Sequence, residues 1–222
     1  MDAKHTIHIG NIVRNAAVFN FRNWSGGTEM NTDALRQAVV RLFALLHERQ
    51  IEYVLVGGIA LRHYVDSRNT EDIDLVMASS DLERMPEIEI ADREEYFARG
   101  KYNELRVDVL LTRNPLFSKL QSRYATTQPF MERNIVCATV EGLLLLKLYA
   151  LPSLYRQGNF TRVALYENDI ATLMYAYQPE LAPLFDELSH HLSDADLTSV
   201  REITTEIQQR IDRFRQTSGD GE

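Results

Sequence analysis

The sequence predicts an α+β protein in which a small mixed sheet with helices is followed by a helical half. Three short segments rich in apolar and β-branched residues are typical of strands: Glu52–Val56, Asp72–Met77 and Leu105–Leu111. Beyond Pro115 the apolar residues instead recur at spacings of three and four, as on one face of a helix. Strands followed by a run of helices indicate the α+β class.

Composition limits the kind of protein. The chain has 222 residues, of which 45% are apolar and 25% charged, as in an ordinary globular protein. No apolar run approaches the roughly 20 residues that span a bilayer, and the first residues lack the apolar core of a signal peptide. Because Cys137 is the only cysteine, no intrachain disulfide or zinc finger is possible. We expect a cytoplasmic protein that does not contact a membrane.

Charge is spread unevenly along the chain. The net charge of −8 disfavours nonspecific coating of nucleic acid. From Arg99 to Arg162, however, the chain contains ten basic and four acidic residues, which gives this segment a net charge of +6. This positive middle suits a polyanionic substrate, although a solvated surface with a chance excess of charge explains the count equally well.

The first half contains the predicted strands and two helices. Thr6–Ile9 and Ala17–Phe21 have some strand character, which predicts a hairpin or a packed arm. A helix is predicted from Thr32 to about Gln50, because Leu35, Val39, Leu42 and Leu46 form an apolar stripe. A second helix begins near Ile59, and residues 79–95 are acidic and predicted to be irregular.

The second half is predicted to be entirely helical. Thr139 is placed to cap a helix over Val140–Leu151, which Pro152 follows, and a further helix spans Arg162–Tyr177. Two more apolar stripes mark later helices. With a break near residues 113–118, the predicted parts are an N-terminal extension (1–30), an α/β core (31–114) and a helical domain (115–222).

A glycine pair and two aspartates carry the chemistry of the first half. Gly57 and Gly58 follow a strand and precede a helix, where backbone N–H groups can meet a phosphate. Alternation along the next strand places Asp72 and Asp74 on one face. Two neighbouring carboxylates repel each other unless a cation lies between them, and magnesium prefers such oxygen ligands. The pattern therefore predicts a site for metal and phosphate; an exposed strand face and a plain tight turn are the alternatives.

Three further residues are candidates for the same site. Asp108 lies in the middle of an apolar strand, and burying a carboxylate unpaired is costly, so it is predicted to face the metal site or to pair with a base such as Arg106. Arg68 is a candidate phosphate ligand or a surface residue. Thr70 is placed to hydrogen-bond beside the metal or simply to precede the strand.

Together these residues resemble the DNA polymerase β-type nucleotidyltransferase fold. The version Arg68-x-Thr70-x-Asp72-x-Asp74, with a helical second half, is similar more narrowly to the AbiEii-type family, which includes nucleotidyltransferase toxins of type IV-like toxin–antitoxin systems. The similarity covers about residues 35–178. It implies that Lys147 and Asp169, on later helices, complete the site.

The resemblance gives each candidate a role. Asp72, Asp74 and Asp108 are the implied metal ligands, and the catalytic set is Asp72, Asp74, Lys147 and Asp169. Nucleotide binding is assigned to Gly57, Gly58, Arg68, Thr70 and Lys147. Lys147 lies in an otherwise apolar helix, so its amine either reaches solvent or points into a cleft between the two halves, where we expect the nucleotide. For Asp169 the alternative is an ordinary carboxylate in the first turn of a helix.

The expected activity is magnesium-dependent transfer of a nucleoside monophosphate from a nucleoside triphosphate to an acceptor hydroxyl. The resemblance implies a toxin that modifies tRNA, with a cognate antitoxin as partner. The alternatives are a transferase acting on a small-molecule or protein hydroxyl, and a nucleotide-binding module that has lost catalysis. The complete carboxylate set disfavours the last, since an inactive protein does not need repelling charges side by side.

Overall fold

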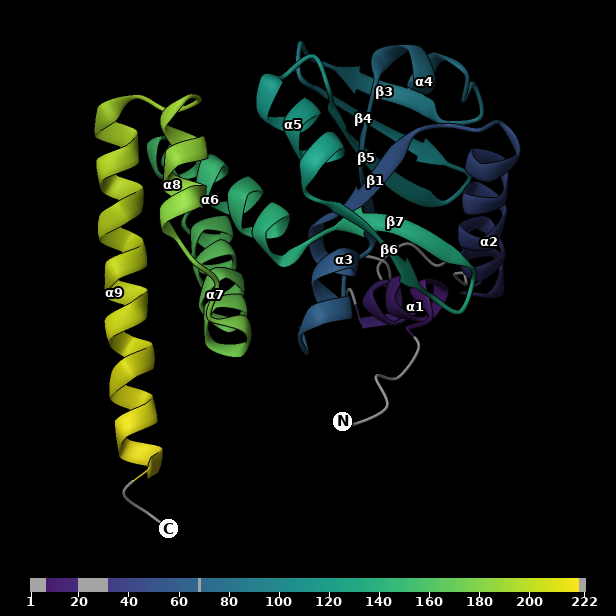
Figure 1. Ribbon diagram of the computed structural model, residues 1–222. Helices are drawn as coiled ribbons and strands as arrows, with labels where there is room; N and C mark the ends of the chain where they lie inside the picture. The colour runs from purple at the N-terminus through teal and green to yellow at the C-terminus, as the bar shows by residue number, and fades with distance from the viewer. Residues whose placement is uncertain (1–6, 20–31, 68, 220–222) are drawn as a thin grey trace. The chain divides into compact units, whose positions relative to one another are not determined.

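The computed structural model describes residues 7–19, 32–67 and 69–219. The chain divides into two compact units, Met1–Thr139 and Val140–Glu222 (Figure 1). The first unit is built around a sheet, and the second consists of helices. This is the α+β architecture that the sequence predicts.

One mixed sheet organises the first unit. Among the described residues it has seven strands in the order β3-β4-β5-β2-β1-β7-β6. Strand β2 runs parallel to β5, and β1 runs parallel to β7, whereas the other neighbours are antiparallel. The strands are β1 (Tyr53–Val56), β2 (Asp72–Met77), β3 (Glu89–Arg93), β4 (Phe97–Tyr102), β5 (Leu105–Leu111), β6 (Ala125–Pro129) and β7 (Asn134–Ala138).

Helices pack on both faces of this sheet. They are α1 (Ile9–Phe19), α2 (Thr32–Glu48), α3 (Gly57–Tyr64), α4 (Ser79–Glu83) and α5 (Pro115–Arg123). Phe43 of α2 lies 5.9 Å, ring to ring, from Tyr53 on one face. Phe117 of α5 lies 5.6 Å from the ring of Phe97. Phe97 is opposite Leu110 in the sheet, on the face that also carries Asp108, so α5 covers one end of that face.

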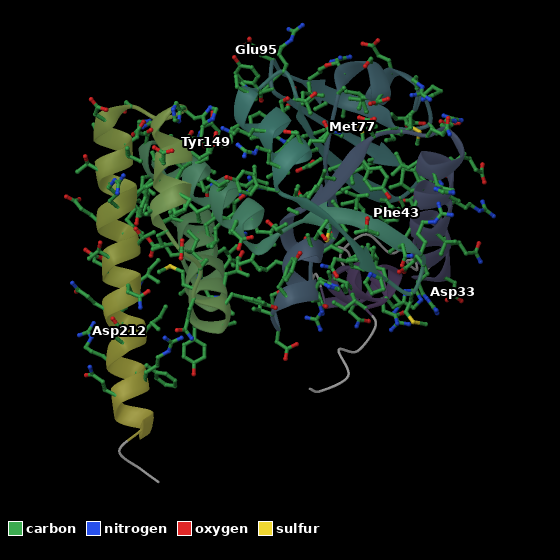
Figure 2. All side chains as sticks on the ribbon, in the orientation of Figure 1. Asp33, Phe43, Met77, Glu95, Tyr149 and Asp212 are labelled. Carbon is green, nitrogen blue, oxygen red and sulfur yellow. The ribbon has the colours of Figure 1, made fainter. Side chains whose placement is uncertain are left out.

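Alternating burial along the central strands confirms the predicted pattern. Ile73, Leu75 and Met77 of β2 are fully buried, whereas Asp72 and Asp74, at the start of the strand on the other face, are half-buried. Val76, on the same face as these aspartates, is buried as well. Tyr53 of β1 is opposite Met77 on this face, and its partner Phe43 of α2 is also fully buried (Figure 2). Burial of apolar surface on the face of Ile73, Leu75 and Met77 stabilises the sheet, and on the opposite face the half-buried positions are those of Asp72 and Asp74.

The second unit contains α6 (Val140–Arg156), α7 (Phe160–Tyr177), α8 (Ala182–Ser189) and α9 (Asp194–Gly219). Asn159 caps α7, since its side chain accepts a hydrogen bond from the Arg162 amide at 3.3 Å. Helix α6 continues past Pro152, where the sequence predicted its end near Leu151. Leu151, Pro152 and Leu154 are all buried, so packing offsets the backbone hydrogen bond that the proline removes.

The N-terminal segment is a helix where the sequence predicted strand character. Ile9, Ile12, Val13 and Ala17 of α1 are buried at helical spacing. Glu132 caps this helix from a distant loop, accepting hydrogen bonds from the amides of Gly10 at 2.9 Å and Ile9 at 3.2 Å. Because that cap comes from residues more than 120 positions away, local pattern did not reveal it. Residues 1–6, 20 and 21 of the predicted hairpin or arm lie outside the described residues.

Three further features differ from the sequence-based expectations. Residues 79–95, predicted to be irregular, contain α4 and β3. The break expected near residues 113–118 lies inside the first compact unit, which ends at Thr139. Strands β6 and β7, which lie beyond Pro115 where only helices were expected, pair as a hairpin next to β1. Their burial depends on pairing with a strand some 80 positions earlier, which the sequence does not display. No helix in the described part of the chain is long and apolar enough to cross a membrane.

Candidate active site

The carboxylates predicted to bind metal lie on one face of the sheet. In the parallel pair β2–β5, Asp74 is opposite Asp108 and Asp72 is opposite Arg106. Neighbouring strands are about 4.8 Å apart, and residues in register share a face. Asp72, Asp74 and Asp108 are all half-buried, whereas Ile73 and Val107, on the other face, are fully buried. The sheet therefore brings together three carboxylates that remain accessible to a ligand.

The glycine turn lies directly against one of these carboxylates. Gly57 adopts a φ of +67°, which favours glycine. A Cβ atom added there would lie 1.9 Å from Oδ2 and 2.4 Å from Cγ of Asp74. Helix α3 begins at this residue, so the amides of its first turn adjoin Asp74. Only glycine leaves room for the Asp74 carboxylate beside the turn.

Thr70 and Gly58 make a second close contact beside the turn. Thr70 is buried, and a Cβ atom on Gly58 would approach its Cγ2 to 3.0 Å. The Asp72 amide donates a long hydrogen bond of 3.5 Å to Thr70 Oγ1. Thr70 thus fixes the approach of the chain to β2 and to Asp72. Arg68, the other nucleotide-binding candidate in this segment, lies outside the described residues.

Arg106 is a site residue that the sequence interpretation placed differently. The sequence offers Arg106 as an ion-pair partner of Asp108, but the structure places its Nη1 4.0 Å from Asp72 Oδ1 and 3.9 Å from Glu71 Oε2. The alternation Arg106-x-Asp108 puts both residues on the carboxylate face. Strand register then determines that Arg106 meets Asp72, and the sequence does not contain that information.

The donor set fits magnesium bound together with a phosphate ligand. No group of three or more Asp, Glu, His or Cys side chains among the described residues is placed to hold a metal ion by itself. Magnesium in proteins usually takes one or two carboxylates and completes its octahedron with water and substrate phosphates. Asp74 and Asp108, opposite each other in the sheet, match that requirement, and Asp72 adds a further oxygen donor on the same face.

In the second unit Lys147 and Asp169 form a buried ion pair. Nζ of Lys147, on α6, lies 2.7 Å from Oδ2 of Asp169 on α7, and the two side chains are only 8% and 7% exposed. The ammonium also lies 4.5 Å from the centre of the Tyr166 ring. Asp169 lies in the middle of α7, which excludes the alternative of a first-turn carboxylate. The charge in the apolar stretch of α6 is therefore explained by a partner one helix away.

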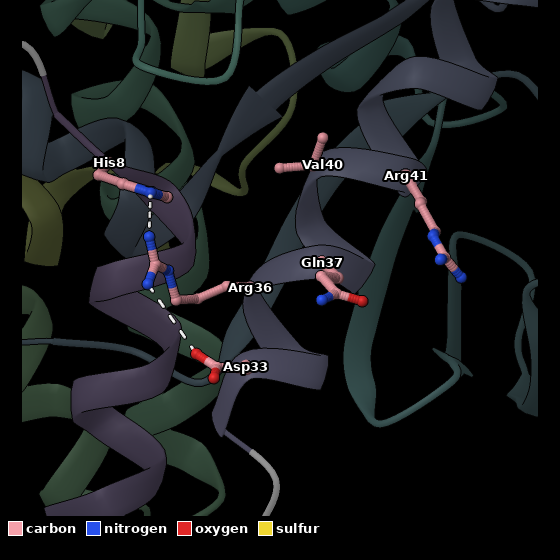
Figure 3. A pocket seen from close by; sticks show the side chains of 6 residues that line it. All are labelled: His8, Asp33, Arg36, Gln37, Val40 and Arg41. Atoms are coloured by element: carbon pink, nitrogen blue, oxygen red, sulfur yellow. Dashed lines mark hydrogen bonds and ion pairs between the residues drawn. The ribbon is translucent and has the colours of Figure 1, made fainter.

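The described residues also form a surface pocket of about 420 Å³ elsewhere in the first unit. It lies between the start of α1 and α2 and is lined by His8, Asp33, Arg36, Gln37, Val40 and Arg41 (Figure 3). Arg36 spans it, with one guanidinium nitrogen 3.2 Å from His8 Nε2 and another 4.0 Å from Asp33. None of the predicted site residues lines this pocket.

Comparison with known structures identifies the fold. No model of a known protein family matches the sequence, and no curated protein matches it. An antigenic nucleotidyltransferase-like protein from Paracoccidioides brasiliensis is similar in structure, with a TM-score of 0.53 and 19% identity over 79% of this chain and 88% of that one. A weaker likeness, with a TM-score of 0.48 and 13% identity over 78% and 98% of the two chains, is to ANT(2'')-Ia in complex with adenylyl-2''-tobramycin. The first of these likenesses shows that the chain has the fold of a nucleotidyltransferase-like protein.

Proposed function

We propose that the protein is a magnesium-dependent nucleotidyltransferase that moves a nucleoside monophosphate from a nucleoside triphosphate to an acceptor hydroxyl and releases pyrophosphate. The observation that carries the proposal is the pairing of Asp74 with Asp108 across β2 and β5, directly beside a glycine whose Cβ would collide with Asp74. A tight turn that only connects a strand to a helix does not need a carboxylate packed against its glycine. The close contact between Gly57 and Asp74 therefore supports a functional role for the turn.

Each residue has a role in the proposed reaction. Asp72, Asp74 and Asp108 would hold Mg²⁺, which when bound neutralises charge on the triphosphate and on the leaving pyrophosphate. Gly57 and Gly58 open α3, and in the proposed reaction its first amides would donate hydrogen bonds to phosphate oxygens. Thr70 holds the chain that leads to Asp72, and Arg68 remains a predicted phosphate ligand.

Lys147 and Asp169 are assigned to the same reaction on the basis of the AbiEii-type resemblance. The carboxylate 2.7 Å away fixes the position of the ammonium within its own unit, which is a property that a phosphate-binding amine requires. Catalysis by this pair, tRNA as the acceptor and a cognate antitoxin as the partner all belong to the proposal. They extend the nucleotidyltransferase assignment to a toxin that modifies tRNA.

The activity is tested with purified protein, Mg²⁺ and each of the four α-³²P-labelled nucleoside triphosphates, using total tRNA, amino sugars and hydroxyl-bearing proteins as acceptors. We expect label in the tRNA fraction with release of pyrophosphate, and loss of both in Asp74→Asn. Asp33→Asn is the matched control, because Asp33 has an 80% exposed side chain far from the carboxylates in sequence. If only amino sugars or proteins are labelled, the acceptor is one of these and not tRNA. If no acceptor is labelled, the proposed activity is refuted.

The toxin assignment has its own test in cells. Expression of the wild-type chain is expected to arrest growth, and Asp74→Asn is expected to relieve the arrest. If Asp74→Asn stays as toxic as the wild type at equal protein levels, the toxicity does not come from the proposed chemistry. Co-expression of the neighbouring reading frame tests the antitoxin in the same assay.

A further inference from the structure

Three basic side chains continue the carboxylate face of the sheet. In the antiparallel pair β4–β5, Arg99 is opposite Asp108 and Lys101 is opposite Arg106. Register partners share a face, so Arg99, Lys101 and Arg106 lie on the same face as the carboxylates; we call these three residues the cationic strip. All three are exposed, and the side chains of Arg99 and Arg106 are 54% and 57% accessible.

The order of residues across this face indicates which side would bind the triphosphate and which side would bind the acceptor. Val56, immediately before the glycine turn, is opposite Asp74 on β2, Asp74 is opposite Asp108 on β5, and Asp108 is opposite Arg99 on β4. In the proposed reaction the triphosphate is held at the glycine turn. Since attack on phosphorus is in line with the leaving group, the acceptor must approach from the side away from pyrophosphate. That side is β5 and β4, where the cationic strip lies.

We infer that the cationic strip holds the acceptor, by binding the phosphate next to the attacking hydroxyl at the end of a single RNA strand. This inference rests on the proposed nucleotidyl transfer to RNA and assigns the residues that bind its acceptor. Guanidinium groups match the geometry of phosphate oxygens.

The existing ion pairs of the strip are weak enough to exchange. Arg99 lies 3.3 Å from Asp92 and 4.0 Å from Glu94, and both carboxylates are more than half exposed. Arg106 is 3.9 and 4.0 Å from its two partners. Ion pairs this exposed contribute little to stability, so a phosphate can replace the carboxylate.

Acidic residues on β3 limit the width of the strip. Glu89 is opposite Lys101, and Asp92 is opposite Arg99, so the positive surface ends at the edge of β4. It therefore spans two strands, or about 5 Å from β4 to β5. A surface this narrow takes one phosphodiester chain and would place the second strand of a duplex against carboxylates. The geometry thus selects a single-stranded end.

Binding is tested without turnover, by fluorescence anisotropy of a short single-stranded RNA labelled at its 5′ end, with no metal or nucleotide present. We expect Arg99→Gln/Lys101→Gln to weaken binding about tenfold and to lower the slope of log K against log salt by about 1. Arg93→Gln is the matched control. It is an exposed arginine on the neighbouring strand, opposite Ala98 and thus on the other face.

A second variant must change affinity in the opposite direction. Asp92→Asn removes a partner of Arg99 and is expected to tighten RNA binding several-fold while the fold is unchanged by circular dichroism. The strip assignment is overturned if the double variant binds RNA like the Arg93→Gln control, if Asp92→Asn weakens binding, or if duplex RNA binds as tightly as the single strand.

The acceptor is tested by steady-state transfer. Arg99→Gln/Lys101→Gln is expected to raise KM for RNA about tenfold and to leave KM for the nucleoside triphosphate unchanged. Wild-type transfer to RNA with an unaltered KM in the double variant would refute only the strip. Absence of transfer by the wild type to any acceptor would refute the proposed function, and the binding measurement would still decide whether the strip holds RNA.

Discussion

Replacement of Gly57 by alanine tests the contact on which the site depends. The added Cβ would lie 1.9 Å from Asp74 Oδ2 and 2.8 Å from Asp74 Cβ, so the carboxylate must move. Alanine at φ +67° costs about 1–2 kcal/mol because of its left-handed backbone. Overpacking against Asp74 adds about 1–3 kcal/mol. Displacing a reacting group by about 1 Å lowers turnover roughly a hundredfold.

Gly158→Ala separates backbone strain from displacement of the carboxylate. Gly158 has nearly the same φ, +64°, and a Cβ atom added there meets nothing within 4 Å. We expect urea denaturation to show only the left-handed cost of about 1–2 kcal/mol for Gly158→Ala, with normal nucleotidyl transfer. Gly57→Ala is expected to lose about twice as much stability and nearly all transfer.

A double variant tests whether the cost of Gly57→Ala comes from its contact with Asp74. Removing the carboxylate in Asp74→Ala takes away the two closest atoms, Oδ2 and Cγ. Gly57→Ala should therefore cost less stability in the Asp74→Ala background than in the wild type, a non-additive pair. If the two substitutions are additive, or if Gly57→Ala retains wild-type transfer, then the close approach does not position Asp74 and the reasoning fails.

The remaining predictions concern other buried groups. Lys147→Met leaves the Asp169 carboxylate buried without its 2.7 Å partner and should cost about 3–5 kcal/mol in urea denaturation. Adding Asp169→Leu should restore most of that loss; if it does not, the loss does not come from the unpaired Asp169 carboxylate. Burial raises the pKa of the Cys137 thiol to about 11, so a thiol reagent at pH 8 should label it only after unfolding. The unfolded thiol ionises near 9, so its contribution to stability falls from pH 9 to 11, a loss that Cys137→Ala should remove. Glu132→Gln weakens the two amide contacts that cap α1 and should lower stability by about 1 kcal/mol, whereas an unchanged melting curve would contradict the cap.

Much of the candidate site follows from short-range patterns. Alternation in a six-residue strand is enough to put Asp72 and Asp74 on one face, since side chains alternate in any strand. A glycine pair between a strand and a helix predicts a turn that needs a positive φ, and Gly57 has one. The apolar surroundings of Lys147 single out its charge, but from the sequence its amine is expected to reach solvent or a cleft between the halves. In the structure it is buried against Asp169, since an unpaired buried ammonium is too costly.

Other features depend on contacts between distant residues. Asp74 meets Asp108, and Asp108 meets Arg99, only because β2, β5 and β4 pair in one particular register. A shift of one residue would turn every side chain of a strand to the opposite face. Helix α1 is similarly capped by Glu132, from the far end of the first unit's sequence.

The sequence by itself therefore determined the class of fold, the face of each carboxylate and the glycine turn, because these depend on neighbours within a few residues. Tertiary structure alone decided which residues meet across strands. It placed Arg106 beside Asp72, put Arg99 and Lys101 on the carboxylate face, and set Asp169 against Lys147. The physical reason is that backbone pairing and helix packing fix these distances, and both require segments far apart in the chain to be folded together.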